Sequence, residues 1–167
     1  MIDGTITNLV IPQGTASIRG GVCEGLEDLE NVYIPESVFL IAESAFVGCT
    51  SLVTAEIDEN IGIQTLPESM FEDCSSLENF VIPPSIEVLG DYLFKNCTSL
   101  ETVTMPAGIT TLGTDIFDNC SALTDIYYGN TEEEWEYLMG EYPDRIPAGV
   151  TVHFTEPQTE EEEDPEI

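Results

Sequence analysis

Apolar and polar positions along this chain repeat one phrase about every 23 residues. In each copy a phenylalanine lies three positions before a cysteine, and a leucine lies three positions after it. The phenylalanines of the four clear copies are Phe46, Phe71, Phe94 and Phe117. The first step is 25 residues and the next two are 23, so the period is 23 with one two-residue insertion near residues 61–64. A fixed step of this length is typical of a solenoid, whose coils bury their apolar side chains against one another.

A short alternating run in each coil predicts a β-strand that ends at an Ile-Pro or Met-Pro pair, except in the third coil, where Ile57-Asp58 takes that place. Examples are 31–34, 79–82 and 102–105. In the first run, Val32 and Ile34 should face the core and Tyr33 should lie outside. Proline fixes φ and donates no backbone hydrogen bond, so each strand should stop there. Two more apolar positions and a short turn then lead to the phenylalanine and the cysteine, which we expect to point inward.

Aligning the prolines recovers a degenerate first copy, in which Cys23 takes the phenylalanine position and Leu26 the cysteine position. We therefore divide the chain into an N-terminal edge (1–7), a solenoid (8–129), a C-terminal cap (130–155) and an acidic tail or linker (156–167). Residues 1–7 are too short to shield the first coil. Either the natural protein continues upstream or a partner covers this edge. The start of the chain shows neither the basic residues nor the apolar run of a signal peptide.

The cap is predicted from residues 131–154. Thr131 and Glu134 form a capping-box pattern, with Thr131 as the N-cap of a helix. Trp135, Leu138 and Met139 recur at helical spacing and should cover the open end of the core. Residues 146–154 then supply a last alternating strand. An exposed Trp135 that stacks on a sugar or anchors a partner is the alternative to core packing.

The Ile-Pro pairs, the paired Val or Ile positions and the Phe-x-x-Cys turn resemble the leucine-rich repeats of the BspA-like, or Treponema pallidum, type. The resemblance covers about three quarters of the chain. It implies an α/β fold, a right-handed leucine-rich repeat solenoid with a parallel sheet on its concave face. It also implies an extracellular or cell-surface protein of host-associated bacteria that acts in adhesion by binding other proteins, host matrix proteins among them. The departures from the pattern are the insertion and the missing phenylalanine and cysteine of the first coil.

Composition adds a strong negative charge, because 33 acidic residues face three basic ones and give a net charge of -30. Only seven of the acids lie in 156–167, so the folded part is acidic too. This field repels phosphate backbones, which argues against nucleic acid as a partner. A solvated surface is the simplest interpretation, and a site that attracts cationic proteins is the alternative. No run of residues is long enough for membrane insertion.

The five cysteines predict no chemistry. Four of them, at 49, 74, 97 and 120, take the same place in successive coils and should form an inward row of free thiols rather than disulfides. The chain has one histidine, His153, and no Cys-x-x-Cys pair, so no metal site is predicted. We expect His153 to be exposed and without a special role. Calcium between acidic loops stays open, without a calcium-loop motif to support it. No nucleophile motif or phosphate loop is present, and we expect neither enzymatic activity nor a cofactor.

The candidate partner-binding residues follow from strand alternation, which leaves two rows on the outer face of the sheet. The first row is Val10, Tyr33, Glu56, Val81, Thr104 and Tyr127, and the second includes Asn8, Asn31 and Asn79. Such a mixture of aromatic and hydrogen-bonding residues is common at protein interfaces. The same residues also suit strands by propensity alone.

Two function classes remain. The first is a non-catalytic protein-binding or adhesion module whose partner is a host matrix protein or another bacterial surface protein. The second is a structural spacer or targeting arm of a larger surface protein or enzyme. Carbohydrate binding is a third alternative with less support.

Overall fold

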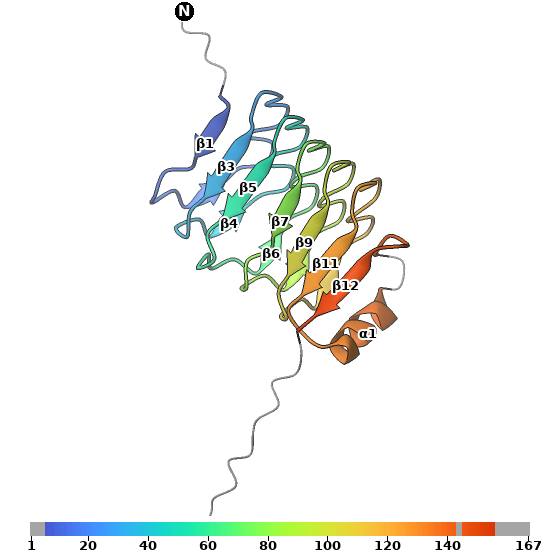
Figure 1. The fold of residues 1–167 in the computed structure, drawn as a ribbon. Coiled ribbons are helices and arrows are strands. Elements are labelled where there is room, and N and C mark those ends of the chain that lie inside the picture. The colour runs from blue at the N-terminus through green and yellow to red at the C-terminus, as the bar shows by residue number, and fades with distance from the viewer. Residues whose placement is uncertain (1–5, 143–144, 156–167) are drawn as a thin grey trace, which may run out of the picture.

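Each coil of the chain contributes one strand to a seven-stranded parallel sheet, in the order β1-β3-β5-β7-β9-β11-β12. The computed structural model describes residues 6–142 and 145–155. The strands of this sheet are β1 (Asn8–Val10), β3 (Asn31–Ile34), β5 (Thr54–Ile57), β7 (Asn79–Val81), β9 (Thr102–Met105), β11 (Asp125–Tyr128) and β12 (Thr151–Phe154). Figure 1 shows them side by side along the solenoid. The predicted solenoid of 23-residue coils is confirmed.

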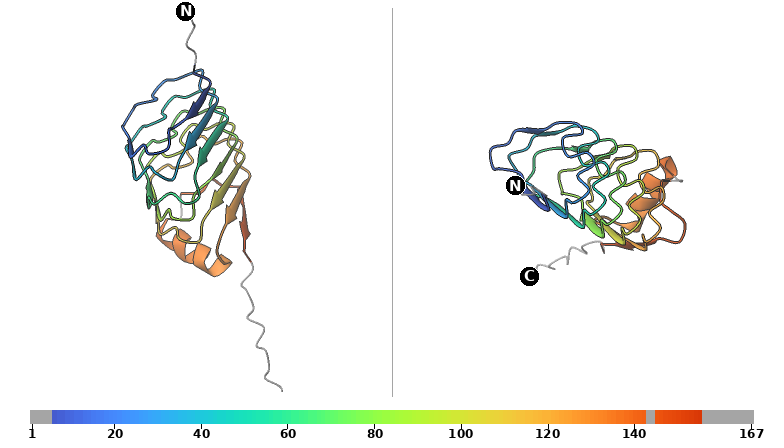
Figure 2. Two further views of the ribbon diagram at one scale, coloured as in Figure 1. Left: turned by 90° about the vertical axis from the view of Figure 1, so that its left-hand side faces the viewer. Right: turned by 90° about the horizontal axis from the view of Figure 1, so that it is seen from above.

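A second strand of two residues in each coil lies on another side of the solenoid. These strands are β2 (Ser17–Ile18), β4 (Leu40–Ile41), β6 (Thr65–Leu66), β8 (Val88–Leu89) and β10 (Thr111–Leu112). They form one two-stranded sheet, β2-β4, and one three-stranded sheet, β10-β8-β6. In Figure 2 the long sheet occupies one flank of the molecule and the turns occupy another. The predicted acidic tail and most of the N-terminal edge lie outside the described residues.

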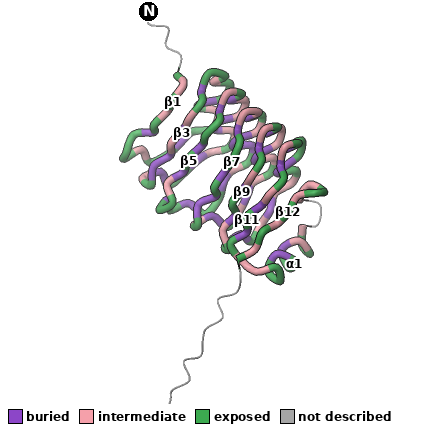
Figure 3. Tube along the Cα trace, in the orientation of Figure 1, coloured by how far each residue is buried: buried purple, intermediate pink, exposed green. Residues whose placement is uncertain are grey.

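The core is a column of side chains that all strands and turns share. Alternation along the strands is as predicted, since Val32 and Ile34 are buried and Tyr33 is partly exposed. Figure 3 shows the same change between buried and exposed positions in each coil. The rings of Phe46, Phe71, Phe94 and Phe117 stack in sequence at 5.6, 6.0 and 5.7 Å between centroids. Stacking of identical positions therefore turns the sequence repeat into one continuous core.

The cysteines form the predicted inward row, and all five are buried and free. Four of the thiols, those of Cys49, Cys74, Cys97 and Cys120, donate a hydrogen bond to a carbonyl of the coil before, at 3.1–3.2 Å. Cys97 Sγ, for example, donates to the Phe71 carbonyl at 3.1 Å. The row thus satisfies four backbone acceptors inside the solenoid.

The two-residue insertion interrupts the stacking of the coils. The register pairs Leu66 with Leu89, and Gln64 donates a hydrogen bond to Glu87 at 3.0 Å, so the extra residues are Gly62 and Ile63. Neighbouring strands of the long sheet pair at three or four positions, but β5 and β7 pair at one. On the other side, β4 and β6 belong to different sheets. In the third coil, β5 therefore stays in the long sheet but pairs with β7 at one position, whereas β6 pairs with the following coil and not with β4.

The C-terminal cap consists of α1 (Glu132–Glu141) and β12. Thr131 is the N-cap as predicted, and its hydroxyl accepts from the Glu134 amide at 3.4 Å. The other half of the predicted capping box is wrong, because the Thr131 amide donates to Asn130 Oδ1 at 2.9 Å. Trp135 is buried, which confirms core packing, and its ring contacts those of Tyr128 and Phe154.

The last strand is shorter than predicted, since only Thr151–Phe154 of the expected 146–154 pairs with β11. The segment before it contains Pro147 and a turn at Gly149, whose φ is +91°, so the backbone cannot extend there. Within the described residues, no helix has the length and apolar character needed to cross a membrane.

Candidate functional site on the outer face of the sheet

The structure places all nine candidate residues on the outer face of the long sheet. Register aligns Val10 with Tyr33, Tyr33 with Glu56, Val81 with Thr104, and Thr104 with Tyr127. Val10, Val81 and Tyr127 are 69%, 65% and 46% exposed. The face therefore presents aromatic and apolar side chains to solvent, although their role in binding is a separate question.

The asparagine row is connected by hydrogen bonds in two places. Asn31 Nδ2 donates to Asn8 Oδ1 at 2.8 Å, and Thr102 Oγ1 donates to Asn79 Oδ1 at 2.6 Å. Between these two pairs lies Thr54, next to the weak β5–β7 pairing. The row therefore contains one hydrogen-bonded pair before Thr54 and one after it, and Thr54 itself joins neither pair.

A groove of about 600 Å³ opens on this face where β5 and β7 lose their pairing. Four of the nine candidates line it, namely Tyr33, Glu56, Asn79 and Val81. The other lining residues are Thr54, Ala55, Ile57, Asp58, Glu59 and Asn60. We call this feature the sheet groove. It brings the centre of the first candidate row together with the acidic turn after β5.

Tyr33 and Asp58 are joined by a hydrogen bond in the sheet groove. The Tyr33 hydroxyl donates to Asp58 Oδ2 at 2.7 Å, and the Asn60 amide donates to Asp58 Oδ1 at 2.9 Å. These hydrogen bonds, that of Tyr33 first, lower the pKa of the Asp58 carboxyl. The same bond raises the pKa of Tyr33. Asp58 therefore stays ionised in the groove at neutral pH and below.

A second cluster lies at the C-terminal end of the same face. His153 Nε2 lies 2.6 Å from Asp125 Oδ1, and the His153 ring stacks on Tyr127 at 4.6 Å between centroids. Thr124 Oγ1 donates to Asp125 Oδ2 at 2.7 Å, and both contacts lower the pKa of Asp125, the His153 hydrogen bond most. His153 is exposed as predicted, and in this cluster it contacts Asp125 and Tyr127 of β11.

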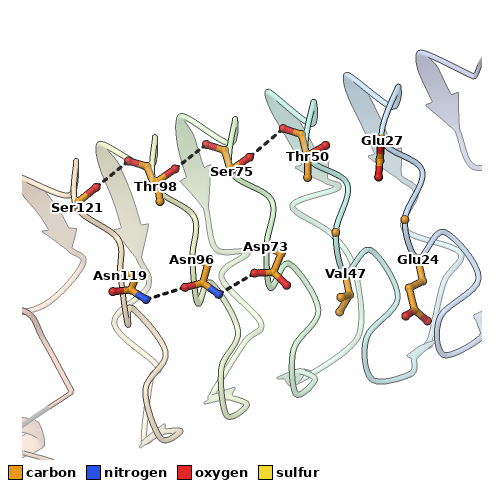
Figure 4. Close-up of a pocket in the computed structure, with 12 residues that line it drawn as sticks. Glu24, Glu27, Val47, Thr50, Asp73, Ser75, Asn96, Thr98, Asn119 and Ser121 are labelled. Carbon is orange, nitrogen blue, oxygen red and sulfur yellow. Dashed lines mark hydrogen bonds between the residues drawn. The ribbon is translucent and has the colours of Figure 1, made fainter.

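A shallower hollow of about 760 Å³ runs along the turns of the coils. Two ladders border it, as Figure 4 shows. In one, Asn119 Nδ2 donates to Asn96 Oδ1 at 2.8 Å and Asn96 Nδ2 donates to Asp73 Oδ1 at 2.7 Å. In the other, hydroxyls of Ser121, Thr98 and Ser75 donate to carbonyls of the preceding coils. The first ladder joins side chains to one another, and the second joins side chains to main-chain carbonyls.

Among the described residues, no group of three or more His, Cys, Asp or Glu side chains is arranged to hold a metal ion. Sequence reasoning missed Asp58 and Asn60 as groove residues, because strand alternation says nothing of turns. The two-residue insertion was the one feature of the sequence that pointed to this region, because a change in repeat length disturbs the pairing of neighbouring coils.

Comparison with protein families gives one match. The model described as "BspA type Leucine rich repeat region" matches residues 3–124 in six copies. No curated protein sequence matches the chain.

Solved structures of the same shape come from several bacteria. The T. pallidum leucine-rich repeat protein TpLRR is 29% identical, with a TM-score of 0.69, and the match covers 74% of this chain and 59% of that protein. A leucine-rich cell surface protein from Faecalibacterium prausnitzii is 32% identical, with a TM-score of 0.75, over 79% of this chain and 34% of that one. A leucine-rich repeat protein from Bacteroides ovatus, 21% identical over 90% of this chain and 42% of its own, shares the fold with a TM-score of 0.66. The chain thus matches about a third to three fifths of the length of these proteins.

Proposed function

Because this chain belongs to the BspA-type leucine-rich repeat family, we propose that it is a non-catalytic protein-binding module of a bacterial cell-surface or secreted protein. We propose further that it binds through the outer face of the long sheet. Leucine-rich repeat proteins generally bind rather than catalyse. The surface location is supported by the F. prausnitzii protein, which is a cell surface protein.

The sheet groove is the observation that carries the choice of this face. Parallel sheets are usually covered on both sides, and here the outer side is open. On that side the strand ladder weakens at β5 and β7, and the opening is lined by Tyr33 and by the exposed Val81. Partly exposed aromatic residues beside an apolar side chain are typical anchors of protein interfaces.

Binding to a panel of purified host matrix proteins and bacterial surface proteins tests the proposal. The test compares the wild type with the double variant Tyr33→Ala, Tyr127→Ala by biolayer interferometry. Hot-spot tyrosines contribute about 2 kcal/mol or more, so we expect at least about a thirtyfold loss of affinity for the captured ligand.

Tyr137→Ala is the matched control, because Tyr137 is 74% exposed but lies on α1, away from the face. Its affinity should stay at the wild-type value. Equal affinity of the wild type and the double variant would remove the outer face as the binding site.

A structural spacer or targeting arm is the second candidate function. This chain matches only part of the length of each solved relative. A longer protein has room for another activity outside the coils, which supports this second candidate. Deleting residues 6–155 from the gene in its own bacterium separates the two functions. Loss of attachment to the ligand supports the binding module, whereas loss of surface display of a linked enzyme activity supports the arm.

A further inference from the structure

We propose that the sheet groove binds an extended, cationic segment of the partner protein, with a lysine or arginine head group held by Glu56 and Asp58. This inference rests on the proposed function and names the chemistry of its partner. The segment lies along the opening between β5 and β7, and the aliphatic stem of its basic residue packs on Val81.

The groove has the shape for an extended chain because the insertion separates two neighbouring strands. β5 and β7 pair only between Thr54 and Asn79, so the strands are not tied together beyond that point. The opening lies toward Ile57 and Val81, at the ends of these strands. β5 and β7 stay adjacent in the sheet, so the segment lies over the opening on the outer side and contacts its walls.

The walls of the groove supply both an apolar and a charged contact. Val81 is 65% exposed, and Ala55 and Ile57 line the groove beside it. Lysine and arginine lay their stems along apolar surface while their head groups stay with polar partners. Among the described residues, the carboxylates of Glu56 and Glu59 have no hydrogen-bond or ion-pair partner. The groove therefore carries uncompensated negative charge.

Asp58 is held in place to receive a charged donor. The Tyr33 hydroxyl and the Asn60 amide each donate to one Asp58 oxygen, at 2.7 and 2.9 Å. The carboxylate therefore cannot rotate freely, and its remaining lone pairs are open to a further donor. Hydrogen bonds between a charged donor and a carboxylate are about twice as strong as neutral ones. A preordered acceptor also reduces the entropy that binding must overcome.

The charge of the molecule selects among occupants. A second copy of this chain carries a net charge of -30 and is repelled, and nucleic acid is repelled for the same reason. The described residues of the groove do not form a metal-binding group of three ligands. A basic segment is attracted both by the groove and by the field around it.

A seven-residue peptide of alternating lysine and valine, with blocked ends, is the probe, and the same peptide with glutamate in place of lysine is its control. Binding is measured by fluorescence anisotropy at low and physiological salt, and the site is located by NMR shifts of Val81 and Tyr33. The groove variant is Glu56→Gln, Asp58→Asn, Glu59→Gln. The matched variant, Glu132→Gln, Glu133→Gln, Glu136→Gln, removes the same charge from exposed positions of α1.

We expect the lysine peptide to shift Val81 and Tyr33 and to lose at least about tenfold in affinity with the groove variant, against less than about twofold with the α1 variant. Equal losses with the two variants, or shifts spread over the whole surface, would show unspecific attraction and overturn the inference. A ligand from the panel that depends on Tyr33 and Tyr127 but ignores the groove variant would also overturn it, and the proposed function would stand. A panel ligand that ignores the tyrosines would instead remove the outer face as the binding site, and this inference with it.

Discussion

At the scale of single residues, the turns explain the choice of side chains better than the strands do. Each turn bends through two residues with positive φ. The second of them is Gly25, Gly48, Asp73, Asn96 or Asn119 in successive coils, with φ between 58° and 72°. Only glycine, asparagine and aspartate adopt this left-handed conformation readily. The position before the cysteine is therefore restricted by backbone geometry.

Asn96 tests this restriction. Asn96→Ala loses two side-chain hydrogen bonds and places at φ +62° an alanine, which adopts the left-handed conformation less readily than asparagine. It should cost about 2–3 kcal/mol of unfolding free energy. Asn96→Gly loses the same bonds without the conformational strain and should cost about 1 kcal/mol. Urea unfolding measures both. An alanine variant as stable as the glycine variant would contradict the role of the left-handed backbone.

The buried thiols make stability depend on pH. Burial raises the pKa of Cys49 to about 11 and of Cys120 to about 12, and also raises those of Cys74 and Cys97. In the unfolded chain thiols ionise near pH 8.5. Above that pH the unfolded state loses protons that the folded state keeps, so the free energy of unfolding should be constant below about pH 7.5 and fall toward pH 9.5.

Urea midpoints measured between pH 7 and pH 9.5 check this, with reductant present. Cys97→Ala is the control, because removing one buried thiol should reduce the slope while the carboxylates stay ionised throughout. An unchanged midpoint over this range would mean that the thiols ionise in the folded state as they do in the unfolded chain.

At the scale of elements, the sequence period was enough to predict the first strand of each coil and the inward side chains, but not the two-residue strands on the second side. Val32, Ile34, Phe46 and Cys49 have fixed places in a repeat, and every coil gives independent support for them. The groove could not be predicted in the same way. It depends on how Gly62 and Ile63 divide the third coil between its neighbours, and no second copy of that event exists in the described coils.

Hydrogen bonds of individual caps were also beyond prediction. Three residues near the start of α1 carry side-chain oxygens that can accept hydrogen bonds from its first amides, namely Asn130, Thr131 and Glu134. The sequence does not show which amide each of them takes. In the structure the Asn130 side chain takes the Thr131 amide. Likewise, His153 and Asp125 are 28 residues apart and meet only because β12 returns beside β11.

Deleting Gly62 and Ile63 should close the sheet groove. The deletion restores the 23-residue step, so β5 should pair with β7 along its whole length and β4 should approach β6. Hydrogen exchange of residues 54–58 and 79–82 should become slower. Ile63→Ala is the control, because it removes the buried side chain but keeps the insertion. Faster exchange in the deletion variant, compared with Ile63→Ala, would show that the insertion stabilises the ladder.

At the scale of the whole molecule, charge opposes the compact fold. The chain has a net charge of -30, and among the described residues Lys95 forms an ion pair with Glu72 while His153 forms a hydrogen bond with Asp125. The remaining carboxylates lie at the surface and repel one another. The packed phenylalanine and cysteine column must outweigh this repulsion, which is one reason why a regular core matters in so acidic a protein.

Salt should therefore stabilise the fold. Raising sodium chloride from 10 to 300 mM shortens the screening length from about 30 Å to below 8 Å, which weakens repulsion between coils. A gain of about 1 kcal/mol corresponds to about 2–4 °C in melting temperature for a domain of this size. Differential scanning calorimetry measures the shift, and potassium chloride should give the same result because screening does not depend on the identity of the cation. A melting temperature that falls with salt would contradict dominant repulsion.

Calcium at matched ionic strength provides the sharper comparison. A larger shift of the melting temperature with calcium than with sodium would identify bound divalent ions on the acidic surface. An equal shift would leave screening as the whole cause.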